Sequence, residues 1–309
     1  MQIHSPYFDA TNVAALARLD VARALAEDLG NHAAPSTRND LTASLVVAHT
    51  HARARILARE DAVLCGQPWV EAAFRALDPD VQLHWQVREG QACHANQTVL
   101  EMAGDAQALL SAERTALNFL QLLSAVASKT ARYVAAVAAV PGNRTHIVDT
   151  RKTLPGLRMA QKYAVAVGGG VNHRIGLHDA ILIKENHIAA AGGIPQVLER
   201  ARQQAGNARF IQIEVETLTQ LRDALTHGAR MVLLDNMDLA TLHQAVALNA
   251  ELGAQRGSGT MGPAILEISG GVTFDGLAAL AQTGVDRISI GTLTKDVQAT
   301  DYSMRFEGL

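Results

Sequence analysis

Cationic side chains gather in one stretch of the chain, residues 149–187. They fall within a single predicted strand-loop-strand unit and comprise Arg151, Lys152, Arg158, His173, Arg174, Lys184 and His187. Guanidinium groups bind carboxylates through two parallel hydrogen bonds, whereas a lysine ammonium offers a compact charge suited to phosphate or a second carboxylate. The mixture predicts the anion-binding half of an active site for a small molecule with several anionic groups.

Lys184 is the strongest candidate for a ligand-binding residue in this stretch, because it ends the almost wholly apolar run AILIK. A long cation at the end of a buried strand is costly unless it meets a partner or a ligand. The alternative for the whole stretch is a charged, solvated helix face with its loops. Arg158 and His187 are weaker candidates and are compatible with structural roles.

Carboxylates follow on other predicted strands. Glu214 and Glu216 are two residues apart on one strand, so we expect them to point the same way, and Asp235 ends the next strand. Carboxylates in a phosphate site are the usual means of holding Mg²⁺. Salt bridges to the lysines are the alternative for all three side chains.

Glycines end the last two predicted strands, in SGG at 269–271 and GT at 291–292. Many barrels present backbone N–H groups to a phosphate at such positions. By contrast, GGG at 168–170 follows no strand and fits no phosphate-loop motif, so it indicates a turn after a helix.

Short β-branched runs must position these groups. Six follow residue 140, most of them separated by helical segments: THIVDT, AILIKEN, FIQIEVET, MVLLDNM, AILEISGG and RISIGT. Strands that alternate with helices imply parallel βαβ units, and their number favours a closed or nearly closed α/β barrel. A doubly wound open sheet is the competing architecture. In a barrel, the polar group that ends each run would lie at the functional face.

The chain before these runs has a different pattern of predicted helices and strands. Up to about residue 110 it mixes a helical segment with short strand-like runs, which indicates a small α+β layer. Residues 105–140 then show an apolar stripe at helical spacing. Arg114 lies on the opposite face of that helix, where spacing alone predicts a solvated surface arginine.

Composition limits the class of protein. The chain has 309 residues, 48% of them hydrophobic and 18% charged, as expected for a globular protein with a large core. The net charge of −3 gives no overall basic field to attract nucleic acid or an anionic membrane. The two cysteines, Cys65 and Cys93, fit neither a redox pair nor a zinc site, and no apolar stretch is long enough to span a bilayer. These features favour a reducing, cytoplasmic setting.

Taken together, several motifs resemble one family, the quinolinate phosphoribosyltransferases, also called nicotinate-nucleotide pyrophosphorylases (carboxylating). The resemblance spans ERTALNFLQLLS (113–124), DTRKTLPGLR (149–158), KYAVAVGGGVNHRIGLHDAILIKENHI (162–188), EVE (214–216), LLDNM (233–237), SGGV (269–272) and ISIGTLT (288–294). LAEDLG and NDLTA resemble the family's N-terminal domain more loosely.

The resemblance implies a fold and an assembly. The expected fold is α/β, with an incomplete, seven-stranded α/β barrel over residues 119–292 and an N-terminal α/β sandwich domain over residues 1–118, to which residues 293–309 return. Arg114 matches an arginine that reaches the active site of the neighbouring subunit in this family. A homodimer with shared sites is therefore implied.

The resemblance also implies a reaction, a pentosyl transfer in NAD biosynthesis. Phosphoribose would pass from phosphoribosyl pyrophosphate to the ring nitrogen of quinolinate, with loss of CO₂ and pyrophosphate, to give nicotinate mononucleotide. Arg114, Arg151, His173, Arg174 and Lys184 would bind quinolinate. Lys152, Glu216, Asp235, Ser269, Gly270 and Gly291 would bind phosphoribosyl pyrophosphate, with Mg²⁺ at Glu216 and Asp235. Lys152, Lys184, Glu216 and Asp235 would be the catalytic residues.

Three other functions stay open on the residues alone. Lys184 could form a Schiff base with a carbonyl substrate, as in aldolase-type lyases. The chain could instead be a sensor that binds pyridine dicarboxylates or sugar phosphates without turnover. It could also be a divergent transferase that acts on another acid, such as nicotinate.

Overall fold

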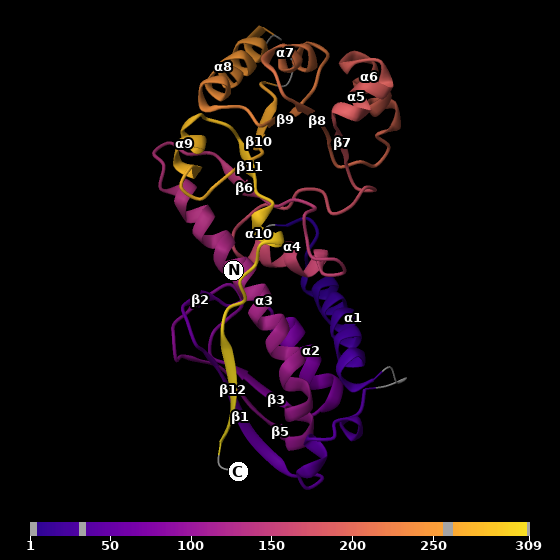
Figure 1. The fold of residues 1–309 in the computed structure, drawn as a ribbon, viewed down its shortest axis with the longest axis vertical. Coiled ribbons are helices and arrows are strands. Elements are labelled where there is room, and N and C mark those ends of the chain that lie inside the picture. Colours follow the sequence, from indigo (N-terminus) through magenta and orange to yellow (C-terminus); the bar gives the residue numbers. More distant parts are fainter. Residues whose placement is uncertain (1–4, 31–34, 256–261, 308–309) are drawn as a thin grey trace. The chain divides into compact units, whose positions relative to one another are not determined.

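The computed structural model describes residues 5–30, 35–255 and 262–307 (Figure 1). The chain divides into two compact units, each built from separate segments. The first unit comprises Met1–Ala131, Thr153–Gly169 and Thr292–Leu309, and the second comprises Arg132–Lys152 and Gly170–Gly291. The long helix α3, Ala106–Ala138, contains the first point of division.

A four-stranded antiparallel sheet forms one layer of the first unit. Its strands, in sheet order, are β12 (Tyr302–Glu307), β1 (His51–Ala58), β5 (Thr98–Asp105) and β3 (Gln82–Trp85). Buried and exposed residues alternate along β1, as expected for a strand with one face on a core. The last strand of the chain therefore completes a sheet that begins near residue 50, with Tyr302 opposite Ala58. A two-stranded ribbon, β2 (Ala62–Val63) with β4 (Ala92–Cys93), lies between these elements in sequence.

Helices supply the rest of this unit. They are α1 (Ala10–Leu29), α2 (Gln67–Leu77), the first part of α3, α4 (Arg158–Val167), α10 (Thr292–Lys295) and the short 3₁₀ turns Thr37–Asn39 and Ala43–Leu45. Trp69 of α2 is completely buried, and its ring centroid lies 5.3 Å from that of Tyr163 and 6.4 Å from that of Phe119. This aromatic cluster joins α2, α3 and α4 into one core.

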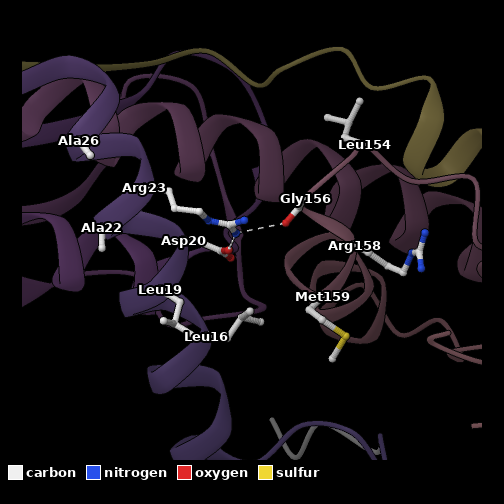
Figure 2. Close-up of a pocket in the computed structure, with 10 residues that line it drawn as sticks. All are labelled: Leu16, Leu19, Asp20, Ala22, Arg23, Ala26, Leu154, Gly156, Arg158 and Met159. Carbon is white, nitrogen blue, oxygen red and sulfur yellow. Dashed lines mark hydrogen bonds and ion pairs between the residues drawn. The ribbon is translucent and has the colours of Figure 1, made fainter. Parts of the chain in front are cut away.

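The first unit also holds a cavity of about 850 Å³ between α1 and the segment that leads into α4 (Figure 2). Arg23 bridges the two sides, because its guanidinium pairs with Asp20 and donates to the carbonyl oxygen of Gly156 at 3.3 Å. Asp20 is buried and also accepts from the indole nitrogen of Trp69 at 3.0 Å. These contacts fix the chain that follows Lys152 to α1.

The second unit is built on a parallel sheet of six strands. In sheet order they are β6 (His146–Val148), β11 (Arg287–Ser289), β10 (Ile265–Ser269), β9 (Met231–Asp235), β8 (Ile211–Val215) and β7 (Ile181–Ile183). The prediction of an α/β fold with parallel strands is confirmed. The first strand of the unit lies beside the last, which is the circular order of a barrel and not the reversal that defines a doubly wound sheet.

Helices α5 (Glu185–Ala191), α6 (Ile194–Gln204), α7 (Leu218–Thr226), α8 (Leu239–Gln255) and α9 (Leu277–Gln282) connect these strands. The strands are short and largely buried, as in β9, because both faces of a parallel sheet are covered. Within the described ranges, no helix combines the length and apolar character needed to cross a membrane.

Candidate active site

A polar cavity of about 280 Å³ lies in the second unit. It is lined by Thr150, Arg151, Lys152, His173, Arg174, Leu182, Lys184, Glu214, Leu233, Glu267, Ser269 and Ser289. Every strand of the parallel sheet contributes a lining residue from its own length or from the residues just after it. The cavity thus gathers six of the residues that the sequence predicts for the site: Arg151, Lys152, His173, Arg174, Lys184 and Ser269.

Asp149, the residue after β6, holds one wall of this cavity in place. Its completely buried carboxylate accepts from the backbone N–H of His173 and from the side-chain amide of Asn172, both at 2.8 Å. Val171 forms an isolated parallel bridge with Val148 of β6. These bonds tie the segment that carries His173 and Arg174 to the end of β6, which Arg151 and Lys152 follow.

Arg174 is almost completely buried in this wall. Its guanidinium donates to the carbonyl oxygen of Ala180 at 3.2 Å. Burial lowers the pKa of Arg174, and the positive charge of Arg151 lowers it further. Two guanidinium groups that oppose each other's charge in a partly dry site favour the binding of an anion between them.

The two ring nitrogens of His173 have different partners. Nδ1 accepts from the backbone N–H of Arg174 at 2.8 Å, and Nε2 lies 2.7 Å from the amide oxygen of Gln212. Because that oxygen only accepts, the ring proton is on Nε2. Phe210 packs edge-on against the ring with centroids 5.2 Å apart. His173 is therefore held firmly in one orientation.

Lys184 follows β7 and stands at the start of α5. Its backbone N–H donates to Nδ1 of His187 at 2.9 Å, which gives His187 a structural role in this turn. The Lys184 ammonium lies 3.4 Å from a carboxylate oxygen of Glu214 on the neighbouring strand β8. Burial raises the pKa of Glu214, while the charge of Lys184 lowers it.

The predicted acidic residues are placed differently from one another. Strand β8 ends at Val215, and Glu216, one residue further, is exposed. Glu214, not Glu216, lines the cavity. Asp235 ends β9 opposite Ser269 of β10, and one of its oxygens accepts from the side-chain amide of Asn236 at 3.0 Å.

The glycines that follow β10 and β11 make room for neighbouring groups. Gly270 has a φ of +91°, and a Cβ there would lie 2.1 Å from the side-chain oxygen of Asn236. A Cβ on Gly291 would lie 2.8 Å from Cδ of Lys152. Only glycine fits these positions without moving Asn236 or Lys152.

Two predicted residues, Arg114 and Arg158, belong to the first unit and are not among the residues that line this cavity. Arg114 is exposed on α3, as its spacing predicts for a surface residue. Arg158 opens α4 and lines the cavity beside α1, where its side chain donates to the hydroxyl of Thr153 at 3.2 Å. The cationic stretch of the sequence is thus divided between the two units.

Sequence reasoning missed Thr150, Glu267 and Ser289 as lining residues. Glu267 lies two residues before Ser269 on β10, so it shares the inward face of that strand. The same alternation applied to every strand would have pointed to these inward positions.

Family models and known proteins were compared with the chain. The model for the N-terminal domain of quinolinate phosphoribosyl transferase matches residues 40–124, and the model for the C-terminal domain matches residues 126–305. A probable nicotinate-nucleotide pyrophosphorylase [carboxylating] of Bacillus subtilis is 39% identical over 90% of this chain and 89% of its own length. The Mycobacterium leprae nicotinate-nucleotide pyrophosphorylase [carboxylating] is 38% identical over 93% of this chain and 96% of its own.

Solved structures give the same result. A nicotinate-nucleotide pyrophosphorylase from Francisella tularensis superposes with a TM-score of 0.85 at 37% identity, covering 99% of each chain. A second from Ehrlichia chaffeensis gives 0.82 at 33% identity, covering 97% of this chain and 99% of its own.

The fold and the cavity define an α/β enzyme with a cationic site at the carboxyl ends of parallel strands. The chain belongs to the quinolinate phosphoribosyl transferase family. The resemblance found in the sequence motifs is therefore confirmed.

Proposed function

We propose that the chain transfers phosphoribose from phosphoribosyl pyrophosphate to quinolinate, with decarboxylation, to give nicotinate mononucleotide, pyrophosphate and CO₂. The observation that carries the proposal is the convergence of Arg151, Lys152, Arg174 and Lys184 on one cavity of about 280 Å³. A dicarboxylate complements the positive charge that these groups bring to the cavity. The family names of the relatives support the same reaction.

In this proposal Arg151, His173, Arg174 and Lys184 form the pocket for the two ring carboxylates. The nucleophile is the pyridine nitrogen of quinolinate, so the protein need not supply one. Fixing both carboxylates orients that nitrogen toward the anomeric carbon, and such positioning lowers the barrier of a bimolecular step. Arg114 of a second subunit would complete the pocket in a homodimer, in line with its exposed position on α3.

Lys152, Ser269, Gly270 and Gly291 form the proposed site for phosphoribosyl pyrophosphate. Lys152 packs against Gly291, which supports a place for its ammonium beside the phosphate groups. Departure of pyrophosphate leaves positive charge on the ribose, and carboxylates on neighbouring strands favour that charge. Glu214, Glu216 and Asp235 are the carboxylates that the sequence predicts for the phosphate site, and of these three Glu214 lines the cavity.

Mg²⁺ is proposed to accompany the diphosphate at Glu216 and Asp235. No three His, Cys, Asp or Glu side chains gather as a metal cage within the described residues. A small set of carboxylates at adjacent strand ends still fits Mg²⁺, which commonly uses one or two carboxylates together with substrate phosphates and waters. When bound, the ion would neutralise charge that develops on the leaving pyrophosphate.

Once the ring nitrogen is alkylated, the pyridinium can accept the electron pair released as the adjacent carboxylate leaves as CO₂. The ring carbon must then gain a proton. Lys152 is the proposed donor, because its ammonium carries protons and belongs to the residues that line the cavity.

Finer features of the fold are also proposed. The Val171 bridge beside β6 supports a seventh strand position in the barrel. We also propose the domain limits 1–118 and 119–292, with residues 293–309 returning to the first domain, from the family motifs. The two cysteines, which fit neither a redox pair nor a zinc site, support a cytoplasmic location.

A direct assay tests this function. The protein is incubated with quinolinate, phosphoribosyl pyrophosphate and Mg²⁺, and CO₂ release is followed, with nicotinate in place of quinolinate as the control. We expect turnover with quinolinate only, and its loss on chelation of Mg²⁺. Turnover with nicotinate would favour a divergent transferase, and binding without turnover would favour a sensor. Covalent trapping of a carbonyl substrate at Lys184 by borohydride would indicate a Schiff-base lyase.

A further inference from the structure

A buried ion pair lies at the base of the active-site cavity. Glu267 on β10 and Arg287 on β11 stand directly opposite each other in the parallel register. The carboxylate of Glu267 is completely buried, and its Oε2 lies 3.0 Å from Nε of Arg287. Its other oxygen, Oε1, lies 3.7 Å from Nε2 of His173. One carboxylate thus faces a permanent cation on one side and an imidazole on the other.

This arrangement is poor as a source of stability. Neither oxygen of Glu267 has a hydrogen-bond partner of good geometry among the described residues, and the same holds for Nε and Nη2 of Arg287. Buried charges that lack hydrogen bonds cost free energy relative to an apolar pair of similar size. Because Glu267 also lines the cavity, its carboxylate is placed to act on the site.

The carboxylate acts on the tautomer of His173. The ring proton on Nε2 faces two acceptors, Gln212 Oε1 at 2.7 Å and Glu267 Oε1 at 3.7 Å. In the other tautomer, a lone pair on Nε2 would face both oxygens, and a proton on Nδ1 would face the backbone N–H of Arg174. Negative charge at Glu267 therefore favours the Nε2–H form.

The tautomer in turn determines how Arg174 is held. With Nδ1 unprotonated, His173 accepts the Arg174 backbone N–H at 2.8 Å. The Asp149 carboxylate holds the backbone N–H of His173 itself, and the carbonyl of Ala180 holds the Arg174 guanidinium. A change of tautomer would break the bond between His173 Nδ1 and the backbone N–H of Arg174, and would so release the segment that directs the Arg174 guanidinium.

We propose that Glu267 is a positioning residue for quinolinate. Held by Arg287, it keeps the proton of His173 on Nε2, so that Nδ1 can accept the backbone N–H of Arg174. That bond fixes the Arg174 backbone, and the guanidinium is thereby directed into the carboxylate pocket. His173 then contributes to the pocket through Arg174. This inference rests on the proposed function and names the part of the site that Glu267, Gln212 and Arg287 serve.

Charge removal tests the role of Glu267. Glu267→Gln combined with Arg287→Met leaves no unpaired buried charge, so the variant should fold. We expect the KM for quinolinate to rise about tenfold or more, as for outer-shell partners of functional histidines, with the KM for phosphoribosyl pyrophosphate unchanged. Arg55→Met removes a half-exposed ion pair with Glu307 in the first unit and should change neither KM. An unchanged KM for quinolinate in the double variant, or equal increases in both KM values, would overturn the proposal.

Two substitutions of His173 distinguish the roles of its two ring nitrogens in quinolinate binding. The side-chain oxygen of Asn can occupy the place of Nδ1 and accept the backbone N–H of Arg174, whereas the side-chain nitrogen of Gln reaches the place of Nε2 and donates there. We expect both variants to raise the KM for quinolinate, His173→Gln about tenfold more than His173→Asn. The reverse order would contradict the proposal, because it would mean that Nε2 is the nitrogen on which quinolinate binding depends.

A spectroscopic measurement is independent of turnover. Nitrogen chemical shifts of His173 in the ¹⁵N-labelled parent protein should report the Nε2–H tautomer, and the Nδ1–H form would refute the inference. If the parent protein lacks transferase activity, the proposed function fails, but this measurement still decides the tautomer. If the parent is active and the Glu267 variant behaves like it, only the further inference fails.

Discussion

The Lys184 ammonium lies 3.4 Å from the Glu214 carboxylate, across two adjacent strands of the parallel sheet. About half of the Lys184 side chain remains exposed (52%), whereas that of Glu214 is largely covered (15%). The lysine is thus anchored on one side and open on the other. An anionic ligand can reach it without first breaking the contact to Glu214.

Lys184→Ala should therefore lower kcat/KM for quinolinate. Hydrogen bonds to charged groups contribute about 1.5–3 kcal/mol, which corresponds to a loss of roughly 10- to 100-fold. Arg151→Ala should give a loss of the same order for the same reason. Steady-state kinetics checks both, with Arg200→Ala on the exposed side of α6 as a control. Losses no larger than in that control would remove these residues from the carboxylate pocket.

Arg114 tests the shared site of the proposed homodimer. Arg114→Ala and Lys184→Ala subunits should each be nearly inactive by themselves. When they are mixed in equal amounts and allowed to exchange, about a quarter of the sites should combine an intact cavity with an intact neighbouring Arg114. Recovered activity near that fraction is the expected result. A mixture no more active than its two components would place Arg114 outside the partner's site.

Gly270 tests the strand end proposed to bind phosphate. Gly270→Ala puts a Cβ 2.1 Å from the side-chain oxygen of Asn236, in a backbone conformation with φ of +91°. We expect a clear increase in the KM for phosphoribosyl pyrophosphate. Gly271→Ala is the matched control, since its φ is +59° but nothing lies within 4 Å of its Cβ. Equal effects of the two substitutions would mean that backbone strain alone, and not the contact to Asn236, matters here.

The sequence predicted the strands of the second unit well, because their buried, β-branched runs have few alternative structures. It treated Arg158 as a weaker candidate than Arg151, but both lie in one basic segment, and only the contacts of residues 153–169 with α1 place Arg158 in the first unit. It could not distinguish Glu214 from Glu216, since that depends on where β8 ends. Strand alternation could have placed Glu267 in the cavity, but its contact with His173 and the bond of Asp149 to His173 join residues far apart in sequence, and no local pattern predicts such pairs.

Glu89 gives a pH-dependent prediction for the first unit. Its carboxylate accepts from the backbone N–H groups of Gly66 and Gln67 at the start of α2, at 2.8 and 3.0 Å. Burial nevertheless raises the pKa of Glu89 above its usual value. Folded protein then binds more protons than unfolded protein near that pKa, so the contribution of Glu89 to stability is complete at low pH and declines as pH rises through the raised pKa.

Glu89→Gln removes this titration. The parent should be more stable than the variant at about pH 4, and the difference in unfolding free energy should shrink toward about pH 7. Urea unfolding of both proteins at the two pH values measures it. A difference that grows with pH would show that the helix start, and not burial, dominates the environment of Glu89.

The central claim is that the cationic cavity binds a dicarboxylate and that one carboxylate is lost during ribosyl transfer. The most direct measurement uses quinolinate labelled in the carboxylate next to the ring nitrogen, together with phosphoribosyl pyrophosphate and Mg²⁺. We predict that labelled CO₂, pyrophosphate and nicotinate mononucleotide appear in equal amounts, and that Lys184→Ala slows all three together. Release of pyrophosphate without labelled CO₂, or no product from the parent protein, would contradict the account.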